Sequence, residues 1–370
     1  MEMIHTALYN MAAFVVVLST IVFIHEFGHY YIAKLSGVKI EVFSIGFGKE
    51  IFGWNDKSGT RWKFCWIPFG GYVKMFGDIN PVSAPDSDKI ASFTEEEKKN
   101  AFHEKPLYIK AAIVAAGPIA NFILSIAILI FFFFHYGKPV TLPEVSSVLE
   151  KSPAAEAGIL PEDFILKLDN EDIESFSDIS RIISLNTGTT IDVTLQRKDK
   201  ILNLKVTPKI TERKDAFGND IKIAMIGVAS TEISYAQIDF PSSVKEAFKE
   251  TYNLSSSTLK AIGQIITGKR SAKELTGPIG IAKYSGQSAK QGVQAVLWFI
   301  IVLSINLGLV NLFPIPALDG GHLLYYAIEA VRGKPMADRL QSYGIKIGVA
   351  LVISLAIFAI INDFRNLNLF

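Results

Sequence analysis

Residues 18–35 read LSTIVFIHEFGHYYIAKL and place His25, Glu26 and His29 directly after an apolar run. That run covers residues 6–24 and is long enough to cross a bilayer. Ionisable side chains beside a membrane span are costly unless they are paired or bind a metal, so they mark a functional site. The stretch therefore predicts a membrane helix together with the chemistry that the helix carries.

The composition of the chain favours a membrane protein. Of its 370 residues, 49% are hydrophobic and 26 are phenylalanine, and the mean hydropathy is +0.31. The formal net charge of +1 and the scattered Lys and Arg residues leave no basic patch, so we exclude nucleic acid as a partner. The single cysteine, Cys65, excludes an intramolecular disulfide and a Cys-based metal cluster. Metal ligands must then come from His, Asp or Glu.

Four apolar stretches predict four transmembrane helices, at residues 6–24, 111–134, 293–318 and 347–361. The first three contain no Asp, Glu, Lys or Arg. The fourth reaches spanning length only if it starts near Gln341 and Lys346 snorkels to the interface. The first span is not a convincing signal peptide, because residues 1–33 contain no Lys or Arg. We expect it to remain as a helix.

The basic residues predict the orientation of these spans. Lys34, Lys39 and Lys49 follow the first span and none precedes it, so we expect the N-terminus outside and the first loop in the cytoplasm. Residues 137–292 then lie outside, and the loop that contains Arg332 and Arg339 lies inside.

The segment after the first span predicts β-hairpins. Residues 36–77 alternate aromatic and β-branched residues with others and are interrupted by glycines. They are too apolar for a free cytosolic hairpin, so we favour a sheet that dips toward the membrane, with a small interfacial hairpin without catalytic part as the alternative. Residues 78–110 turn polar and predict a cytoplasmic loop with a short helix.

The segment after the second span predicts a compact α+β module over residues 137–210. Short strands at 144–148, 164–168, 190–197 and 201–208 surround a helical SDISRIISLN. The order SPAAEAGILPEDFILKLDNEDI resembles a PDZ domain, which binds peptide ends by adding them as a strand. The module could bind a peptide or act as a steric plug. Residues 211–292 predict an amphipathic helix and a linker, with the helix on the outer leaflet or against the module.

His25, Glu26 and His29 form the motif H-E-x-x-H. In a helix, positions i and i+4 share one face, so both imidazoles can reach one metal ion while Glu26 points at the open coordination site. Catalytic zinc sites use three protein ligands and leave one position for water. The motif therefore predicts a zinc site and supplies two of its three protein ligands, so the third must come from elsewhere in the chain.

Asp319 is the favoured third ligand, and His322 competes with it. The first and third spans both run from outside to inside, so His25 and Asp319 arrive near the same face. Pro314 and Pro316 should break the third span into extended backbone before the acidic side chain. His322 begins the basic inner loop and fits a capping or supporting role better.

Together these motifs resemble the site-2 protease family of intramembrane zinc metalloproteases, most closely the bacterial branch that includes the regulator of sigma-E protease. The resemblance rests on HEFGH, GFG, IPFGGYVKM, GPIANF, the PDZ-like insertion and NLFPIPALDGGH, and it covers essentially the whole chain. Where the best-known enterobacterial form carries two tandem PDZ domains, this chain has room for one.

The resemblance implies a role for each matching residue. Zinc would be held by His25, His29 and Asp319, with Glu26 as general base for a zinc-bound water. Asn311 would hold the substrate or stabilise the oxyanion, and Gly46, Phe47 and Gly48 would belong to a membrane-reentrant β-loop that clamps the unwound substrate.

We therefore expect a polytopic α-helical membrane protein with four transmembrane helices, a membrane-associated β-hairpin or sheet and one α+β PDZ-like extracytoplasmic domain. The expected segments are the helix with HExxH (1–35), the hairpins (36–77), the polar loop (78–110), the second helix (111–136), the PDZ-like domain (137–210), the amphipathic helix and linker (211–292), the third helix with the LDG motif (293–322), a cytoplasmic loop (323–340) and the fourth helix with the C-terminus (341–370).

The expected activity is that of a zinc-dependent intramembrane endopeptidase in the bacterial inner membrane, with its active site near the cytoplasmic side. Its partners would be the lipid bilayer, single-span membrane substrates such as anti-sigma factors or remnant signal peptides, and a peptide ligand of the PDZ-like domain. The alternatives are a membrane-anchored PDZ adaptor with a structural metal site and, less favoured, a proton-coupled transporter, which would be expected to show an inverted repeat.

Overall fold

The computed structural model describes residues 2–77, 93–186, 188–214, 220–268, 271–272, 275–334 and 336–366. The chain forms two compact units. The first comprises Met1–Leu129, Ala247–Leu259 and Ala272–Phe370, and the second comprises Ile130–Glu246 and Lys260–Ser271. Part of the predicted polar loop, residues 78–92, lies outside the described residues.

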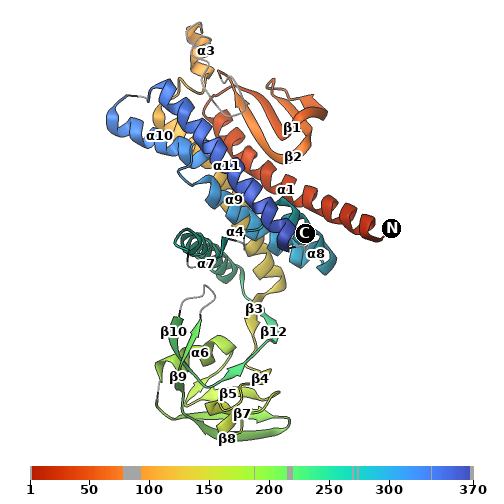
Figure 1. Ribbon diagram of the computed structural model, residues 1–370, viewed down its shortest axis with the longest axis vertical. Helices are drawn as coiled ribbons and strands as arrows, with labels where there is room; N and C mark the ends of the chain where they lie inside the picture. Colours follow the sequence, from red (N-terminus) through yellow and green to blue (C-terminus); the bar gives the residue numbers. More distant parts are fainter. Residues whose placement is uncertain are drawn as a thin grey trace. The chain divides into compact units, whose positions relative to one another are not determined.

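Among the described residues, four helices are long and apolar enough to cross a membrane (Figure 1), and they match the four predicted spans except at the end of the third. They are α1 (Glu2–Leu35), α4 (Leu107–Tyr136), α9 (Val293–Asn311) and α11 (Asp338–Asn366). In α11 only 6% of the apolar window is buried by protein. An apolar helix that exposes almost its whole surface is suited to contact with lipid.

The third span is shorter than the sequence predicted. Helix α9 ends at Asn311, and a new helix, α10, begins at Asp319 and ends at Arg332. Pro314 and Pro316 lack the N–H groups that a continuous helix needs, so the chain turns between the two helices. The first part of the predicted loop at 323–340 therefore belongs to α10, up to Arg332.

Strands β1 (Ile40–Asn55) and β2 (Arg61–Met75) both bend and pair twice. The first half of β1 lies between the two halves of β2: Phe43 pairs with Trp62 on one side and with Val73 on the other. The second half of β1 then pairs with the first half of β2, as Trp54 does with Trp62. The resulting sheet has four rows, and its two outer rows are residues 71–75 of β2 and residues 50–55 of β1, each paired on one side only among the described residues.

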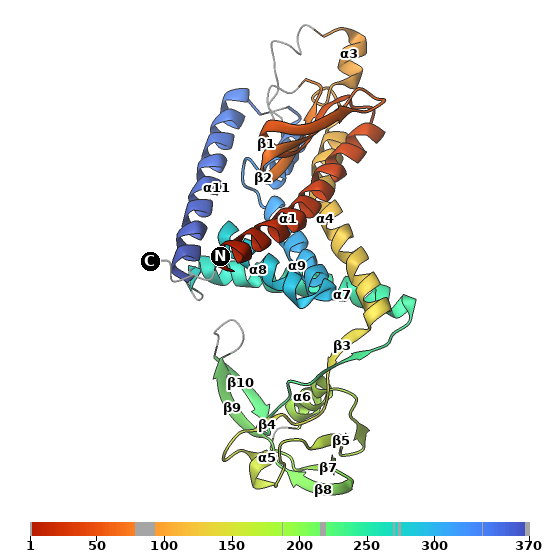
Figure 2. The ribbon, with the colours of Figure 1, turned by 90° about the vertical axis from the view of Figure 1, so that its right-hand side faces the viewer.

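The bend in β1 depends on Gly46 and Gly48. Both adopt positive φ, at 84° and 86°, which glycine accepts without a steric penalty. A Cβ atom on Gly46 would also lie 2.7 Å from the carbonyl oxygen of Ile67. Figures 1 and 2 both show the bent sheet beside α1, where Phe23 and Tyr30 pack on Phe43.

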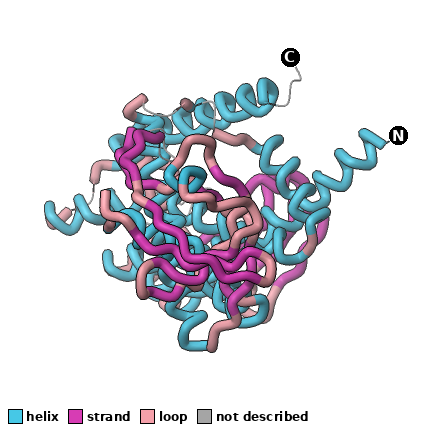
Figure 3. Tube along the Cα trace, turned by 90° about the horizontal axis from the view of Figure 1, so that it is seen from below, coloured by secondary structure: helices cyan, strands magenta, loops and turns pink. Residues whose placement is uncertain are grey.

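The second unit is built on a four-stranded sheet in the order β6-β5-β7-β8 (Figure 3 draws the strands of the chain in magenta). Its strands are β5 (Phe164–Leu168), β6 (Glu171–Asp172), β7 (Ile191–Arg197) and β8 (Lys200–Val206). Ile191, Val193 and Leu195 alternate inward on β7 and pack with Ile179 and Ile182 of α6 (Phe176–Leu185). The predicted α+β module is therefore present.

The module extends beyond residue 210, where the sequence placed only a helix and a linker. Strands β11 (Val228–Ala229) and β12 (Ile233–Ala236) return to pair with β4 (Ser147–Val148) and β3 (Lys138–Thr141). The remaining elements of this region are α5 (Pro153–Glu156), β9 (Lys209–Lys214) and β10 (Asp220–Met225). The amphipathic helix follows as α7 (Phe240–Ile266), capped by Asp239.

The first unit also contains α3 (Glu95–Asn100), a short helix in the polar loop as the sequence predicted, and α8 (Pro278–Gln291), which lies in the region that the sequence assigned to a linker. Asp363 of α11 is buried and accepts hydrogen bonds from the backbone N–H groups of Gly277, Ile279 and Gly280 at 2.9–3.0 Å. A carboxylate at a helix N-terminus satisfies free donors and complements the helix dipole, so it ties α11 to α8.

Candidate metal centre and catalytic cavity

Helix α1 brings His25 and His29 together, as the helical spacing predicted. Their Nε2 atoms lie 3.3 Å apart, and their rings meet edge to face with centroids 4.9 Å apart. Both residues are buried, at 7% and 8% exposure, and Glu26 beside them is 9% exposed. Three ionisable side chains are thus buried together on an apolar helix. Their burial costs free energy unless they are hydrogen-bonded, paired with opposite charges or bound to a metal ion.

Asp319 reaches the two histidines from the first position of α10. Its Oδ2 atom lies 3.2 Å from Nε2 of His25 and 3.5 Å from Nε2 of His29. This oxygen is buried and accepts no hydrogen bond from the residues described. His25, His29 and Asp319 are a group whose ligand atoms all lie within 4.8 Å of one another.

The three ligand atoms fit a zinc ion. Ligands that lie 2.0–2.1 Å from a tetrahedral zinc are about 3.3 Å from one another. The three separations here are 3.2, 3.3 and 3.5 Å, and two imidazoles with one carboxylate are a common zinc donor set. An otherwise unsatisfied buried oxygen of Asp319 is also what a cation would neutralise.

His322, the competing ligand, lies elsewhere in the same cavity. It lines the cavity and packs edge to face on Tyr325, with ring centroids 6.4 Å apart. It is not part of the metal-ligating group formed by the described residues. The geometry thus favours Asp319.

A second row of contacts surrounds the histidines. Nδ1 of His29 donates to the carbonyl oxygen of Ile113 at 2.9 Å, and Nδ1 of His25 lies 3.1 Å from the side-chain amide of Asn121. Both partners belong to α4. On the other side, Nδ2 of Asn311 lies 3.4 Å from Nε2 of His25. Asn311, predicted as a site residue, is therefore beside the centre.

The centre opens into a cavity of about 540 Å³. Glu26, Asn311 and the three metal-ligating residues line it, together with Phe47, Gly70, Gly71 and Tyr72 from the sheet. Of the three predicted hairpin residues, Phe47 lines the cavity, while Gly46 and Gly48 shape the bend beside it.

Sequence reasoning gave no site role to the stretch 70–73. A Cβ atom on Gly71 would lie 2.8 Å from Cγ of Glu26, so this strand passes directly against the glutamate. Phe47 stacks on Tyr72 with centroids 5.9 Å apart. The signal that could have found the stretch is the pair of glycines in IPFGGYVKM, which permits a close approach.

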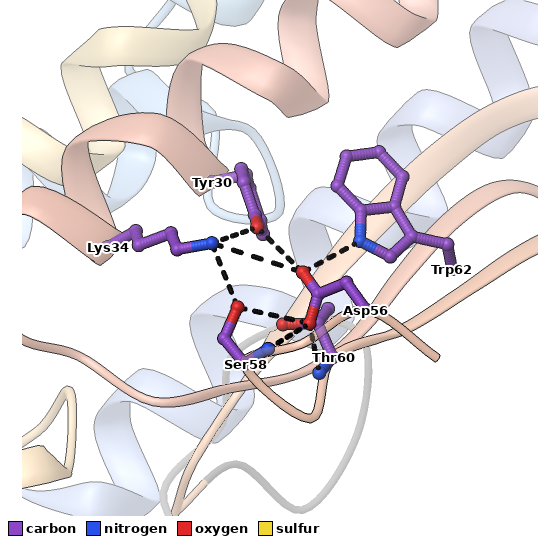
Figure 4. Close-up of polar contacts among 6 residues, drawn as sticks. All are labelled: Tyr30, Lys34, Asp56, Ser58, Thr60 and Trp62. Carbon is purple, nitrogen blue, oxygen red and sulfur yellow. Dashed lines mark hydrogen bonds and ion pairs between the residues drawn. The ribbon is translucent and has the colours of Figure 1, made fainter. Parts of the chain in front are cut away.

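Asp56 fixes the sheet to the end of α1 (Figure 4). Its Oδ2 accepts from the hydroxyl of Tyr30 at 3.1 Å and from the indole of Trp62 at 3.2 Å, and Nζ of Lys34 lies 3.9 Å away. Its Oδ1 accepts from the backbone N–H groups of Ser58 and Thr60, each at 2.9 Å.

These bonds set the charge of Asp56. Burial disfavours its ionised form, but the hydrogen bonds from Thr60, Trp62, Ser58 and Tyr30 outweigh burial and lower the pKa of Asp56 from 3.8 to about 2. The ionised carboxylate therefore links the turn between β1 and β2 to α1, the helix that contains HExxH.

The sequence is similar to those of known metalloproteases. The profile of peptidase family M50 matches residues 13–355. A protein of Agrobacterium fabrum named "Putative zinc metalloprotease Atu1380" is 42% identical over 358 residues, 96% of this chain and 95% of that protein. Metalloprotease MmpA of Caulobacter vibrioides is 35% identical over 377 residues, again 96% of this chain and 95% of that protein.

A solved PDZ domain also matches part of the chain. It belongs to an SdrC-like protein of Listeria monocytogenes, is 22% identical and covers 24% of this chain and 84% of that domain, with a TM-score of 0.20. A likeness at this score carries no argument. The family assignment rests on the sequence matches over nearly the whole length: the chain belongs to peptidase family M50, the site-2 protease family of zinc-dependent peptidases.

Proposed function

We propose that this protein is an intramembrane zinc metalloprotease that hydrolyses peptide bonds of single-span membrane proteins. The observation that carries the proposal is the meeting of His25, His29 and Asp319 beside Glu26, in one cavity among apolar helices. An enzyme that cleaves within or at the edge of the bilayer needs its polar catalytic groups among such apolar helices.

His25, His29 and Asp319 would hold zinc through the two Nε2 atoms and one carboxylate oxygen. When bound, zinc supplies Lewis acidity, which polarises a peptide carbonyl and lowers the pKa of water toward neutrality. Three protein ligands leave a coordination position free, whereas structural zinc sites are closed by four. This disfavours the alternative function, a PDZ adaptor with a structural metal.

Glu26 would act as the general base. It would accept the proton of the attacking water and pass it to the amine of the leaving peptide, a role that suits a carboxylate at the wall of the cavity. Asn311, whose Nδ2 lies 3.4 Å from Nε2 of His25, would donate a hydrogen bond to the oxyanion or to the substrate backbone.

The edge of β2 would hold the substrate strand. A transmembrane helix hides its carbonyl groups in internal hydrogen bonds, so it must unwind before hydrolysis. The stretch 71–75 has an open edge and lines the cavity at Gly71 and Tyr72. Backbone pairing along this edge would replace the lost helical bonds and bring the scissile carbonyl toward Glu26.

The proposed topology follows the basic residues. Lys34, Lys39 and Lys49 favour a cytoplasmic location for the sheet, so the N-terminus and the PDZ-like unit would be extracytoplasmic and the cavity would lie near the cytoplasmic side of a bacterial inner membrane. The PDZ-like unit would bind a peptide end or restrict access, as in regulated intramembrane proteolysis of anti-sigma factors or remnant signal peptides.

Substitution of Glu26 tests the proposed reaction. Glu26→Gln should lower cleavage of a single-span substrate in proteoliposomes by about 10²–10⁴-fold, because a positioned base contributes that much, and it should leave the zinc content unchanged. The matched control is Glu95→Gln, on an exposed residue of α3. Full cleavage by Glu26→Gln would exclude Glu26 as the base, and zinc without any peptidase activity in the wild type would favour the adaptor.

A further inference from the structure

One face of α4 contacts both histidines of the HExxH motif. Ile113, Gly117 and Asn121 are spaced by four residues, so they line one face of the helix. Gly117 and Asn121 belong to the motif GPIANF. We propose that Asn121 is a positioning residue that holds His25 in the ring tautomer required for zinc binding, an inference that rests on the proposed function.

The contact to His29 shows how α4 selects a tautomer. Nδ1 of His29 lies 2.9 Å from the carbonyl oxygen of Ile113, which can only accept a hydrogen bond. The proton of the neutral ring must then be on Nδ1, and Nε2 keeps its lone pair. That lone pair is the one that faces Asp319 at 3.5 Å.

Gly117 provides the space for this arrangement. A Cβ atom on Gly117 would lie 2.2 Å from Nε2 of His29, well inside van der Waals contact. The glycine therefore lets α4 approach so closely that the carbonyl of Ile113, one turn earlier, reaches the ring. Helix α4 thus packs closely against both ring nitrogens of His29: Gly117 lies beside Nε2, and the carbonyl oxygen of Ile113 accepts from Nδ1.

Asn121 has the corresponding place at His25. Its side-chain amide lies 3.1 Å from Nδ1 of His25, and the residue is fully buried. Nδ2 is the atom that faces the ring, while Oδ1 has no hydrogen-bond partner among the described residues. A half-turn of the amide exchanges the two atoms without a change of shape and brings the unused acceptor onto Nδ1.

The orientation of this amide determines which nitrogen of His25 can bind a metal. If Nδ2 donates to Nδ1, the ring proton is on Nε2, and that nitrogen cannot act as a ligand. If Oδ1 accepts from Nδ1–H, Nε2 keeps its lone pair, 3.2 Å from Oδ2 of Asp319. Zinc binding therefore requires the second orientation, in which both histidines are protonated on Nδ1.

The main chain of Asn121 is held independently of the ring. Its carbonyl oxygen accepts from Oγ of Ser125 at 3.0 Å and from Oγ of Ser304 on α9 at 2.9 Å. Both serines are fully buried. The side-chain amide is thereby presented from a fixed point between α4 and α9, as expected for a residue that orients a ligand.

Metal titration of the full-length protein in detergent tests the proposal. The metal-free protein is titrated with Zn²⁺ against a chromophoric chelator. Asn121→Leu, which removes the acceptor, should weaken zinc binding about 10–100-fold, the usual effect of losing such a partner. Asn121→Asp, which keeps an acceptor toward Nδ1, should bind more tightly than the leucine variant. Leu129→Ala is the control for disturbed packing: this fully buried residue lies about two turns further along α4 and does not line the cavity, so the change should leave zinc binding unchanged.

A spectroscopic measurement on the wild type does not depend on how the variants fold. The chain has six histidines, so selective ¹⁵N labelling of the rings gives a spectrum in which His25 is identified by its loss in His25→Ala. With zinc bound, the ring of His25 should be protonated on Nδ1. Protonation on Nε2 in the zinc-loaded wild type would overturn the proposal.

The variants separate failure of this inference from failure of the proposed function. If His25→Ala loses zinc while Asn121→Leu binds it as the wild type does, Asn121 has no positioning role and the proposed site stands. Equal losses in Asn121→Leu and Asn121→Asp would mean that only packing of the amide matters, which also overturns the inference. If His25→Ala retains zinc, the proposed site itself is wrong.

Discussion

Asp319 and His322, the two candidates for the third metal ligand, lie three residues apart but have different surroundings. Asp319 is the first residue of α10 and faces both Nε2 atoms, whereas His322 is nearly one turn further on and packs against Tyr325. Gly320 and Gly321 between them allow α10 to begin against the carbonyl groups of Leu312 and Ile315, since a Cβ atom at either position would lie 2.3–2.4 Å from these oxygens. Close packing of the turn thus directs the carboxylate inward.

Asp319→Asn should lower the zinc content of the purified protein, because a neutral amide is a poor ligand for zinc and no longer neutralises its charge. His322→Ala should keep the zinc content of the wild type. Zinc is measured by elemental analysis after gel filtration in detergent. The reverse pattern, with zinc lost in His322→Ala and retained in Asp319→Asn, would transfer the third-ligand role to His322.

Gly117→Ala should destabilise the protein by about 1–3 kcal/mol and weaken zinc binding, because the added methyl group forces the ring of His29 away from α4. Gly263→Ala on α7 is the matched control: a Cβ atom there has no neighbour within 4 Å, so the change should be neutral or stabilising by about 0.5–1 kcal/mol. Thermal unfolding and zinc titration measure both effects. Equal behaviour of the two variants would contradict the close approach of α4.

The bent sheet determines which strand edge lies beside the cavity, and this is the edge to which we propose that a substrate strand adds. Strand β1 turns at Gly46 and Gly48, so its first half lies inside the ladder and only the end of β2 presents an edge beside the cavity. Asp56 holds the opposite turn of this sheet to Tyr30 on α1, one residue after His29. The distance between the edge strand and Glu26 therefore depends on the contact of the charged Asp56, in the turn between β1 and β2, with Tyr30.

Asp56→Asn tests this contact through its pH dependence. The pKa of Asp56 in the folded protein is about 2, below its ordinary value of 3.8, so the charged form is favoured by folding. Its stabilisation is complete above about pH 4 and is lost as the pH falls toward 2. The wild type should thus unfold at a higher temperature than Asp56→Asn at pH 6, and the difference should shrink between pH 4 and pH 2. A difference that stays constant over this range would show that the charge has no role.

Helix boundaries and strand positions were predictable where they depend on local patterns. The four spans follow from apolar length, and β5, β7 and β8 lie where alternating residues predicted strands. The double pairing of β1 and the return of β11 and β12 were not predictable, because each depends on partners about 30 to 90 residues away, as for Phe43 with Val73 and Val148 with Val228. No periodicity within one strand carries that information.

For the whole molecule, the two compact units have separate cores. In the second unit, Asp163 has no solvent exposure and forms two 2.7 Å bonds with Arg197. In the first, the three residues proposed to hold zinc belong to α1 and α10. Each unit therefore has its own set of stabilising contacts.

Arg197→Met should destabilise the second unit, because it leaves the buried carboxylate of Asp163 without its charged partner, and it should leave the zinc content unchanged. Limited proteolysis reports on the second unit, and elemental analysis reports on the first. Arg181→Met, at an exposed ion pair with Glu171, should cost at most about 1 kcal/mol. Release of zinc by Arg197→Met would mean that the units unfold together.

Site residues were predictable from the sequence where a local pattern places them, and were missed where only contacts between elements do. His25 and His29 follow from one helical turn, and crossing parity already placed Asp319 near them; the structure brings all three together. Asn121 and the stretch 70–73 were not assigned, since their importance comes from contacts between elements. A signal for Asn121 was present, because residues 111–134 contain only two polar side chains, Asn121 and Ser125, and Asn121 is the only amide among them.

The separation of the ligands along the chain also has a consequence for biosynthesis. Asp319 follows His29 by 290 residues, and ribosomes add roughly 5–20 residues per second, so about 15–60 s pass between the synthesis of the two. During this interval the nascent chain has two imidazoles, the glutamate and the sheet, but no carboxylate to complete the centre. With Asp319 as the proposed third ligand, a newly made chain would gain its zinc site, and the peptidase activity that depends on it, only after residue 319 has been added.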